Sequence, residues 1–196
     1  MLAAAPDPQA TSAHVYTAAR PGRAARVIGK GDRVVAEAGG AVRLREVGTA
    51  DAAALYRWRM EPSARAMFRD AGVVPFARHR ALVADYLRPE CTDQWFVVEA
   101  EGCPVGAIAL YRFSADGTEA EWGRFVIALE HRGRGWGRRA LSLLLEYART
   151  LGVRRLRCRV AADNPPADAL YRSLGFADDG VERIGERRFR RLIASL

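Results

Sequence analysis

Three glycines at alternate positions separate an apolar strand pattern from a long helical pattern. The segment 131–139 reads His-Arg-Gly-Arg-Gly-Trp-Gly-Arg-Arg. Glycine lets the backbone turn tightly and lets an anion come close to its amides. The first amides of the following helix have no partner within the helix, and the helix dipole adds positive potential there. The segment therefore predicts a phosphate-binding site, which its arginines reinforce.

The spacing of this turn decides between the known phosphate motifs. A dinucleotide fingerprint needs a glycine where Arg138 stands, and a Walker loop needs a lysine followed by serine or threonine. Both motifs are therefore excluded. Arg132-x-x-Gly135-x-Gly137 instead resembles the acyl-CoA pyrophosphate motif of the GNAT superfamily, [Q/R]-x-x-G-x-[G/A].

A second signature of that superfamily follows downstream. Asn164, then Ala169-Leu170-Tyr171, then Leu174-Gly175-Phe176 resemble it, and the resemblance extends over about residues 41–176. It implies an α/β GNAT fold, with a mixed, mostly antiparallel sheet, splayed central strands and flanking helices. It also implies acetyl-CoA as cofactor and direct transfer of its acetyl group to a primary amine, which makes the chain an enzyme.

The resemblance also assigns cofactor-binding residues. The strand before the turn would offer a backbone amide to the thioester carbonyl, and Ile127 is the best candidate. Asn164 would contact the pantetheine arm or cap a helix. The full expected set is Ile127, Ala128, Leu129, Arg132, Gly133, Arg134, Gly135, Trp136, Gly137, Arg138, Asn164 and Tyr171.

Two side chains are expected to catalyse the transfer. Glu121 stands where many relatives have a glutamate that deprotonates the amine directly or through water. Glu119 shares its strand face, and two neighbouring carboxylates tend to raise one pKa. Tyr171 matches the tyrosine that protonates the departing thiolate. The alternatives are salt-bridged strand glutamates and a tyrosine packed between Leu170 and Leu174.

The acceptor amine is less closely defined. Residues 55–62, Leu-Tyr-Arg-Trp-Arg-Met-Glu-Pro, resemble the start of two GNAT branches, one acting on nucleotide-linked amino sugars and one on protein N-termini, including ribosomal proteins. Met60 replaces the usual asparagine. We expect Trp58 and Arg59 to bind substrate, with Trp58 or Trp122 stacking on a base or sugar. The alternative is an amphipathic core helix that buries Leu55, Trp58 and Met60.

A nucleotide-linked amino sugar is favoured over a peptide because a basic cleft suits a diphosphate. Polyamines are disfavoured because a protein of net charge +8 repels cations. A third hypothesis is a non-catalytic acyl-CoA-binding module on the same fold. The stripe Arg155, Arg157 and Arg159 is interpreted as a solvated face, and the alternative is a site for an anionic substrate or the phosphates of the cofactor. His79 and His131 are expected to be structural or on the surface, and no metal site is predicted.

Hydrophobic periodicity predicts the elements that position these residues. Strands are expected at 42–47, 95–100, 105–111, 120–128 and 153–160, with closing strands near 176 and at 187–194. Helices are expected from about 52 to 59, at 77–87 and 137–151, and in a short segment that begins at Asn164.

Composition bounds the remaining possibilities. The chain has 196 residues, 31 of them basic and 23 acidic, and Lys30 is the only lysine. We expect a flexible extension rich in Ala, Gly, Pro and Arg at 1–40 and one acetyltransferase domain at 41–196. The alternative within the extension is a small hairpin formed by Val27-Ile28 and Val34-Val35. No apolar run approaches the roughly 20 residues of a spanning helix, and no secretory signal is evident, so a cytoplasmic protein is expected. The scattered arginines argue against nucleic acid as a partner.

Overall fold

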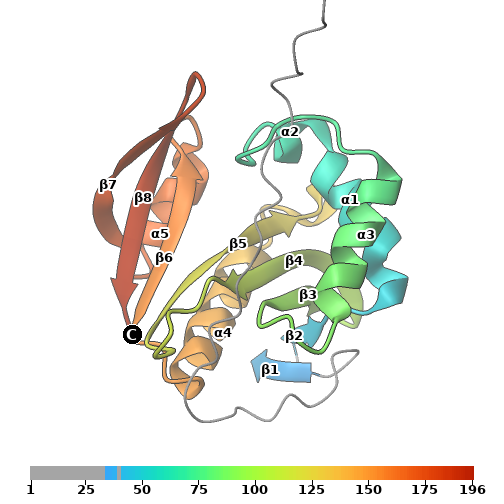
Figure 1. Cartoon of the computed structure of the whole chain (residues 1–196), viewed down its shortest axis with the longest axis horizontal. Coiled ribbons are helices and arrows are strands. Elements are labelled where there is room, and N and C mark those ends of the chain that lie inside the picture. The colour runs from blue at the N-terminus through green and yellow to red at the C-terminus, as the bar shows by residue number, and fades with distance from the viewer. Residues whose placement is uncertain (1–33, 39–40) are drawn as a thin grey trace, which may run out of the picture.

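An eight-stranded sheet organises the chain (Figure 1). The computed structural model describes residues 34–38 and 41–196. The strand order is β1-β2-β3-β4-β5-β6-β8-β7, and only the β5–β6 pair is parallel. The strands are β1 (Val34–Ala38), β2 (Val42–Glu46), β3 (Gln94–Ala100), β4 (Cys103–Tyr111), β5 (Glu119–Ile127), β6 (Arg155–Ala161), β7 (Ala177–Ile184) and β8 (Arg187–Ser195).

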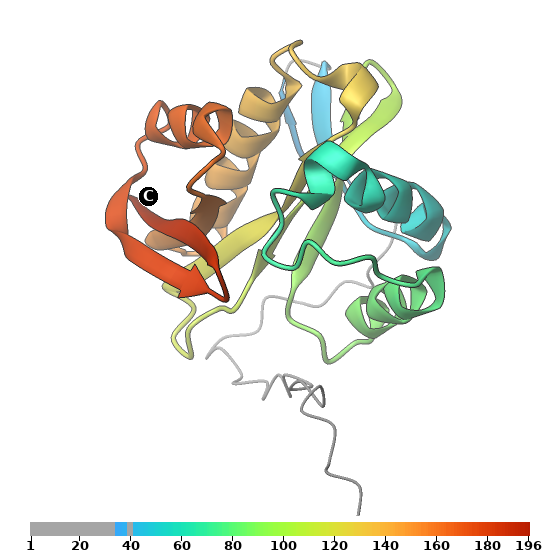
Figure 2. The ribbon, with the colours of Figure 1, turned by 90° about the horizontal axis from the view of Figure 1, so that it is seen from above.

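Helices cover both faces of the sheet (Figure 2). One core lies under α4 and α5 and contains Phe96, Leu144 and Leu156, while the other lies under α1 and α3 and contains Leu55, Val83 and Trp95. The helices are α1 (Ala52–Met60), α2 (Pro62–Arg65), α3 (Phe76–Leu87), α4 (Trp136–Thr150) and α5 (Pro165–Arg172). Short 3-10 turns precede α1 (Thr49–Asp51) and follow β5 (Leu129–His131).

The two central strands diverge. β5 pairs with β6 only from Glu119–Arg155 to Glu121–Arg157, although both strands continue for several residues. On its other edge β5 stays paired with β4 as far as Ile127. The backbone of β5 between residues 122 and 127 therefore has an edge that β6 does not cover. This confirms the predicted mixed sheet with splayed central strands.

A bulge bends β5 inside this open stretch. Ala107 pairs with Val126 and Ala109 with Gly123, so β5 carries one residue more than β4 between these pairs. Arg124 takes up the difference with φ of 48°, in the left-handed region that non-glycine residues rarely adopt. On β4, a side chain at Gly106 would lie 2.2 Å from the carbonyl oxygen of Val126. Glycine at 106 therefore permits the close approach of the two strands.

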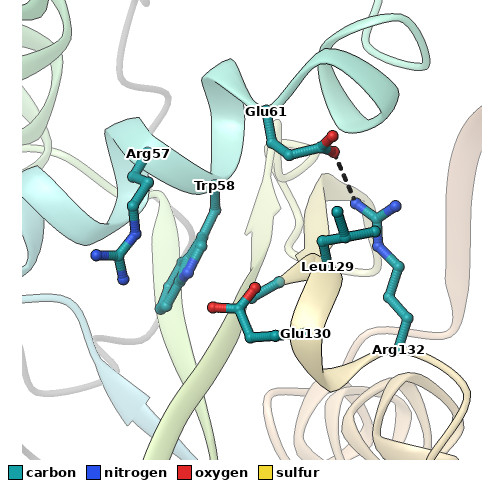
Figure 3. A pocket seen from close by; sticks show the side chains of 7 residues that line it. Arg57, Trp58, Glu61, Leu129, Glu130 and Arg132 are labelled. Carbon is teal, nitrogen blue, oxygen red and sulfur yellow. Dashed lines mark hydrogen bonds and ion pairs between the residues drawn. The ribbon is translucent and has the colours of Figure 1, made fainter.

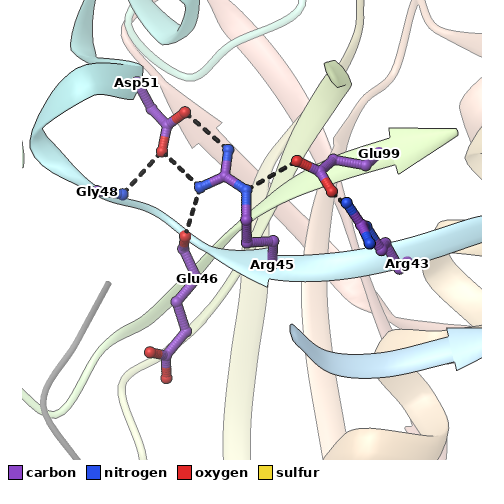
Figure 4. Close-up of polar contacts among 6 residues, drawn as sticks. All are labelled: Arg43, Arg45, Glu46, Gly48, Asp51 and Glu99. Carbon is purple, nitrogen blue, oxygen red and sulfur yellow. Dashed lines mark hydrogen bonds and ion pairs between the residues drawn. The ribbon is translucent and has the colours of Figure 1, made fainter. Parts of the chain in front are cut away.

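An arginine network fixes the start of α1 to the sheet (Figure 4). Arg45 on β2 donates to both carboxylate oxygens of Asp51, at 2.9 and 3.0 Å, and to Glu99 on β3 at 2.8 Å. Asp51 also accepts from the Gly48 amide at 2.8 Å. Burial opposes ionisation of Glu99, but hydrogen bonds from Arg45 and Arg43 outweigh it and lower its pKa. The network thereby anchors the helix that carries Trp58 and Arg59.

The predicted elements agree with the observed ones within a few residues. The sheet starts earlier than the expected domain boundary at Ala41, because β1 at Val34–Ala38 pairs with β2. The remaining residues of the expected extension, 1–33 and 39–40, lie outside the described residues. Among those described, no helix is long and apolar enough to cross a membrane.

Candidate active site

The glycine turn lies where the open edge of β5 meets the start of α4. Gly133 and Gly135 have φ of 76° and 79°, which explains glycine at both positions. A carbon added at either one would meet nothing within 4 Å, so the space beside both backbones is open. Gly135 caps α4, a helix of 15 residues, without a side-chain hydrogen bond. The first amides of α4 have no partner within the helix, and the positive end of the helix dipole lies beside this open space.

Gly137 has a different reason to be glycine. A side-chain carbon there would lie 3.3 Å from Cζ of Phe125 and 3.6 Å from Cγ1 of Ile127. It would also lie 3.9 Å from Leu170 on α5. The third glycine therefore lets the first turn of α4 pack closely on β5, and it brings the end of β5, the turn and α5 together. Trp136, beside it, is buried.

The side chain of Arg132 does not point toward the turn amides. Its guanidinium donates to the hydroxyl of Ser63 at 2.7 Å, to the carboxylate of Glu61 at 3.2 Å and to the carbonyl of Ile127 at 2.9 Å. Figure 3 shows Arg132 reaching from the turn to Glu61, beside a small pocket that Trp58 and Leu129 also line. The side chain of Arg132 is thus engaged away from the turn amides, and contact of Arg132 with a cofactor stays a prediction.

The other expected cofactor residues differ in exposure. Arg134 and Arg138 are both exposed, and Arg138 donates to the hydroxyl of Ser173, just after α5, at 2.6 Å. Leu129 is exposed and Ala128 is buried. Asn164 caps α5 and accepts from the Ala167 amide at 3.3 Å. The predicted N-cap is confirmed, and contact of Asn164 with a cofactor stays a prediction.

The backbone of Ile127 faces the open edge of β5. The amide of Ala128 donates to Val105 on β4 at 2.9 Å. Amides of neighbouring residues in a strand point to opposite edges, so the Ile127 amide points away from β4, toward the side from which β6 has diverged. This geometry distinguishes Ile127 from Ala128, whose amide is already occupied.

Tyr171 is fixed against β5 from the α5 side. Its ring meets Trp122 edge to face with centroids 4.8 Å apart, and Phe176 packs beside both rings. Burial raises the pKa of the Tyr171 hydroxyl well above its usual range, so it retains its proton at neutral pH. Trp122 itself is 1% exposed. The expectation that Trp122 could stack on a ligand is therefore wrong, because its ring fills the core beneath the strand.

Glu121 lies at the point where β5 and β6 separate, on the face opposite Trp122. Its Oε2 accepts from Arg112 at 3.0 Å and from Arg159 at 2.6 Å. Among the described residues, Oε1 has no hydrogen-bond partner. Arg112 and Arg159 were not recognised as partners of Glu121 from sequence, although Arg159 belongs to the stripe noted there.

Glu119 differs from Glu121 because both of its oxygens are engaged. One pairs with Arg155 and the other with Arg157. The hydrogen bond from Arg157 lowers the pKa of Glu119. The expectation that neighbouring carboxylates would raise a pKa thus fails for Glu119, since arginine lies nearer than the second glutamate. The arginine stripe is ion-paired, as Arg157 also faces Asp179 at 3.6 Å and Arg159 faces Glu182 at 2.5 Å.

The two residues expected to bind substrate occupy the C-terminal half of α1. Trp58 is 4% exposed and belongs to the core under α1 and α3, as the core-helix alternative proposed, whereas Met60 is only half-buried. Arg59 lies 4.2 Å above the Phe68 ring and donates to the carbonyl of Asp70. Burial lowers its pKa from the usual value. His79 is buried and packs against the Tyr56 and Trp95 rings.

A mixed sheet whose central strands diverge beside a glycine turn at a helix start defines an acyl-CoA-binding type of α/β fold. The model of the "Acetyltransferase (GNAT) family" matches residues 52–176, which include the turn, Glu121 and Tyr171. The chain belongs to this family of acetyltransferases.

Curated relatives match part of the chain. The spermidine N(1)-acetyltransferase of Vibrio cholerae is 34% identical over 90 residues, which cover 45% of this chain and 51% of the relative. That of Escherichia coli K12 is 32% identical over 90 residues, covering 45% and 48%. The chain thus spans about half the length of these curated relatives.

Solved structures share the fold over more of the chain. Spermidine N-acetyltransferase from Vibrio cholerae, in complex with CoA and spermine, has a TM-score of 0.72 at 23% identity and covers 79% of this chain and 95% of its own. A Salmonella typhimurium acetyltransferase, described as modifying the N-terminal serine of ribosomal protein L7/L12, has a TM-score of 0.71 at 15% identity and covers 84% and 99%.

Proposed function

We propose that the chain is an acetyl-CoA-dependent N-acetyltransferase that moves acetyl directly to a primary amine. The observation that carries this proposal is the family match over the glycine turn together with the separation of β5 and β6 beside it. The amides of the turn and of the first turn of α4 would bind the pyrophosphate of acetyl-CoA. The Ile127 amide would donate to the thioester oxygen, where negative charge builds during the transfer.

The acid and the base lie on opposite faces of β5. Tyr171 packs on Trp122 from the α5 side, while Glu121 projects from the other face because adjacent strand residues alternate. An amine that approaches from the face of Glu121 would lose its proton to Oε1, directly or through water, and attack the carbonyl carbon. The C–S bond then breaks on the side of Tyr171, whose hydroxyl would protonate the departing thiolate. Arginines at Oε2 would hold Glu121 in this orientation.

The charges around the acceptor side favour an amine that also carries negative charge. The carboxylates of Glu119, Glu121, Asp179 and Glu182 are each paired with an arginine, so they offer little to a polycation. Among the described residues, Arg59 and Arg187 have no carboxylate partner and donate to backbone carbonyls. A nucleotide-linked amino sugar fits this balance, although the buried Trp58 and Trp122 no longer support it by stacking.

Spermidine is the second candidate acceptor. The Vibrio cholerae relative that acts on it is 34% identical over 90 residues of this chain. A protein N-terminus is a further outcome that the same assay would detect, as would binding of acetyl-CoA without turnover.

The test is a measurement of CoA release from acetyl-CoA with three acceptors at equal concentration. They are a nucleotide-linked 4-amino sugar, spermidine, and a peptide with a free N-terminal serine. We expect the highest kcat/KM with the sugar nucleotide, falling as salt rises because the attraction is electrostatic. Turnover with spermidine or peptide alone would contradict this choice of acceptor while retaining the reaction. No turnover with any amine would contradict the catalytic proposal.

A further inference from the structure

A short segment beside the site, Glu61–Asp70, depends on arginines from distant parts of the chain. We call these residues the α2 segment. Its helix α2 has only four residues, too few to be stable alone. Arg132, from the glycine turn, contacts its first residues, and Arg187, at the start of β8, donates to the carbonyls of Ala66 and Phe68 at 2.5 and 2.6 Å.

Arg132 joins three parts of the site through one guanidinium. Nε donates to the carbonyl of Ile127, the residue whose amide faces the open edge of β5. The two terminal nitrogens donate to Ser63 and Glu61. Glu61 is also the N-cap of α2 and accepts from the amides of Ser63 and Ala64 at 3.0 and 2.8 Å. Arg132 therefore connects the glycine turn directly to the first residues of the α2 segment.

We propose that Arg132 is a positioning residue, which couples cofactor binding at the glycine turn to the placement of the α2 segment through Glu61 and Ser63. The inference rests on the proposed function, because it requires acetyl-CoA or CoA to order the turn. Bound cofactor fixes the backbone at Arg132, and the side chain of Arg132 then fixes Glu61 and Ser63. The α2 segment is thereby held beside the acceptor side. By linkage, bound cofactor increases the affinity of the protein for an acceptor that touches this segment. The acceptor in turn increases the affinity for the cofactor by the same factor.

The test follows hydrogen exchange of backbone amides in the whole chain with and without CoA. In the natural sequence, CoA is expected to slow exchange both at residues 133–140 and at residues 62–70. The double variant Glu61→Gln/Ser63→Ala leaves Arg132 and the turn intact. It should bind CoA within about twofold of the natural affinity and protect 133–140, but it should lose most of the CoA-dependent protection at 62–70. Ser63→Ala alone is the milder variant if the double variant folds poorly.

Arg187→Gln is the matched control, because it loosens the same segment from the other end. Exchange at 62–70 should become faster with and without CoA, while the slowing caused by CoA persists. A natural chain in which CoA protects 133–140 and leaves 62–70 unchanged would overturn the coupling alone. Equal CoA-dependent protection at 62–70 in the double variant would overturn it as well. Failure of CoA to bind or to protect 133–140 would overturn the proposed function and the coupling with it.

Discussion

Trp122 and Tyr171 lie edge to face with ring centroids 4.8 Å apart, and this contact holds the tyrosine ring against the core face of β5. The tyrosine ring is held by packing, since the described residues give its hydroxyl no hydrogen-bond partner. Packing and chemistry can therefore be separated at this residue by removing the oxygen alone.

Tyr171→Phe tests the acid. The ring and its contacts remain, so the free energy of unfolding should change by less than about 1 kcal/mol. The kcat should fall about a hundredfold, because the thiolate loses its proton donor. Steady-state kinetics with a thermal melt measure both. The control is Tyr147→Phe on α4. It removes the hydroxyl that donates to Gln94 on β3, and it should keep kcat. Unchanged kcat in Tyr171→Phe would remove this residue from the mechanism.

Glu121→Gln tests the base against its neighbour. We expect kcat/KM to fall about a hundredfold, because the amide cannot take the amine proton. Glu119→Gln removes a carboxylate from the same strand face and should change kcat/KM by less than about threefold, since Arg155 and Arg157 already occupy both oxygens. Equal losses in the two variants would indicate a general electrostatic effect of the strand face.

Gly135→Ala tests the anion site at the turn. The left-handed φ of 79° costs alanine about 1 kcal/mol, and its methyl group would occupy the open space beside the amides. The KM for acetyl-CoA should rise about tenfold, which initial-rate kinetics will measure. Gly152→Ala is the matched control, because Gly152 follows α4 with φ of 86° and equally open space. It should lower stability by a similar amount with an unchanged KM.

Glu99→Gln tests the network that anchors α1. The folded protein lowers the pKa of Glu99 below its ordinary value of 4.5, so the charged carboxylate stabilises the fold above about pH 4.5. This contribution is lost as the pH falls through the lowered value. Denaturant titrations should show the variant less stable by about 2 kcal/mol at pH 7. The difference should shrink toward acid pH, and a difference independent of pH would contradict this account.

Sequence alone predicted those features that leave a local pattern. The alternate glycines predicted the turn, and the apolar periodicity of Leu141, Leu144 and Ala148 predicted α4. The bulge at Arg124 was not foreseen, since an arginine with φ of 48° leaves no mark except the neighbouring Gly123. Strand β1 was considered only as part of a possible small hairpin at Val34-Val35, because five residues between glycine-rich stretches carry little periodicity.

Contacts across long stretches of chain also escaped prediction. The partners of Arg132 stand 69 and 71 residues earlier, and no spacing rule connects them. The pairing of Glu121 with Arg112 and Arg159 depends on the order of strands in the sheet, with a sequence separation of 38 residues in the second case. Trp122 was considered for ligand stacking because its type suggested it. Its burial depends on which face of β5 is covered by α5, and the sequence alone did not show where α5 packs.

The most direct test of the central claim is a mass balance with acetyl-CoA labelled in its acetyl group. The purified chain is incubated with the labelled cofactor and each of the three amines, and mass spectrometry quantifies acetylated amine and free CoA. We predict equal amounts of both products with at least one amine, formed far more slowly by Tyr171→Phe. Tight binding of acetyl-CoA without an acetylated amine, or CoA release by hydrolysis alone, would contradict the proposed acetyl transfer.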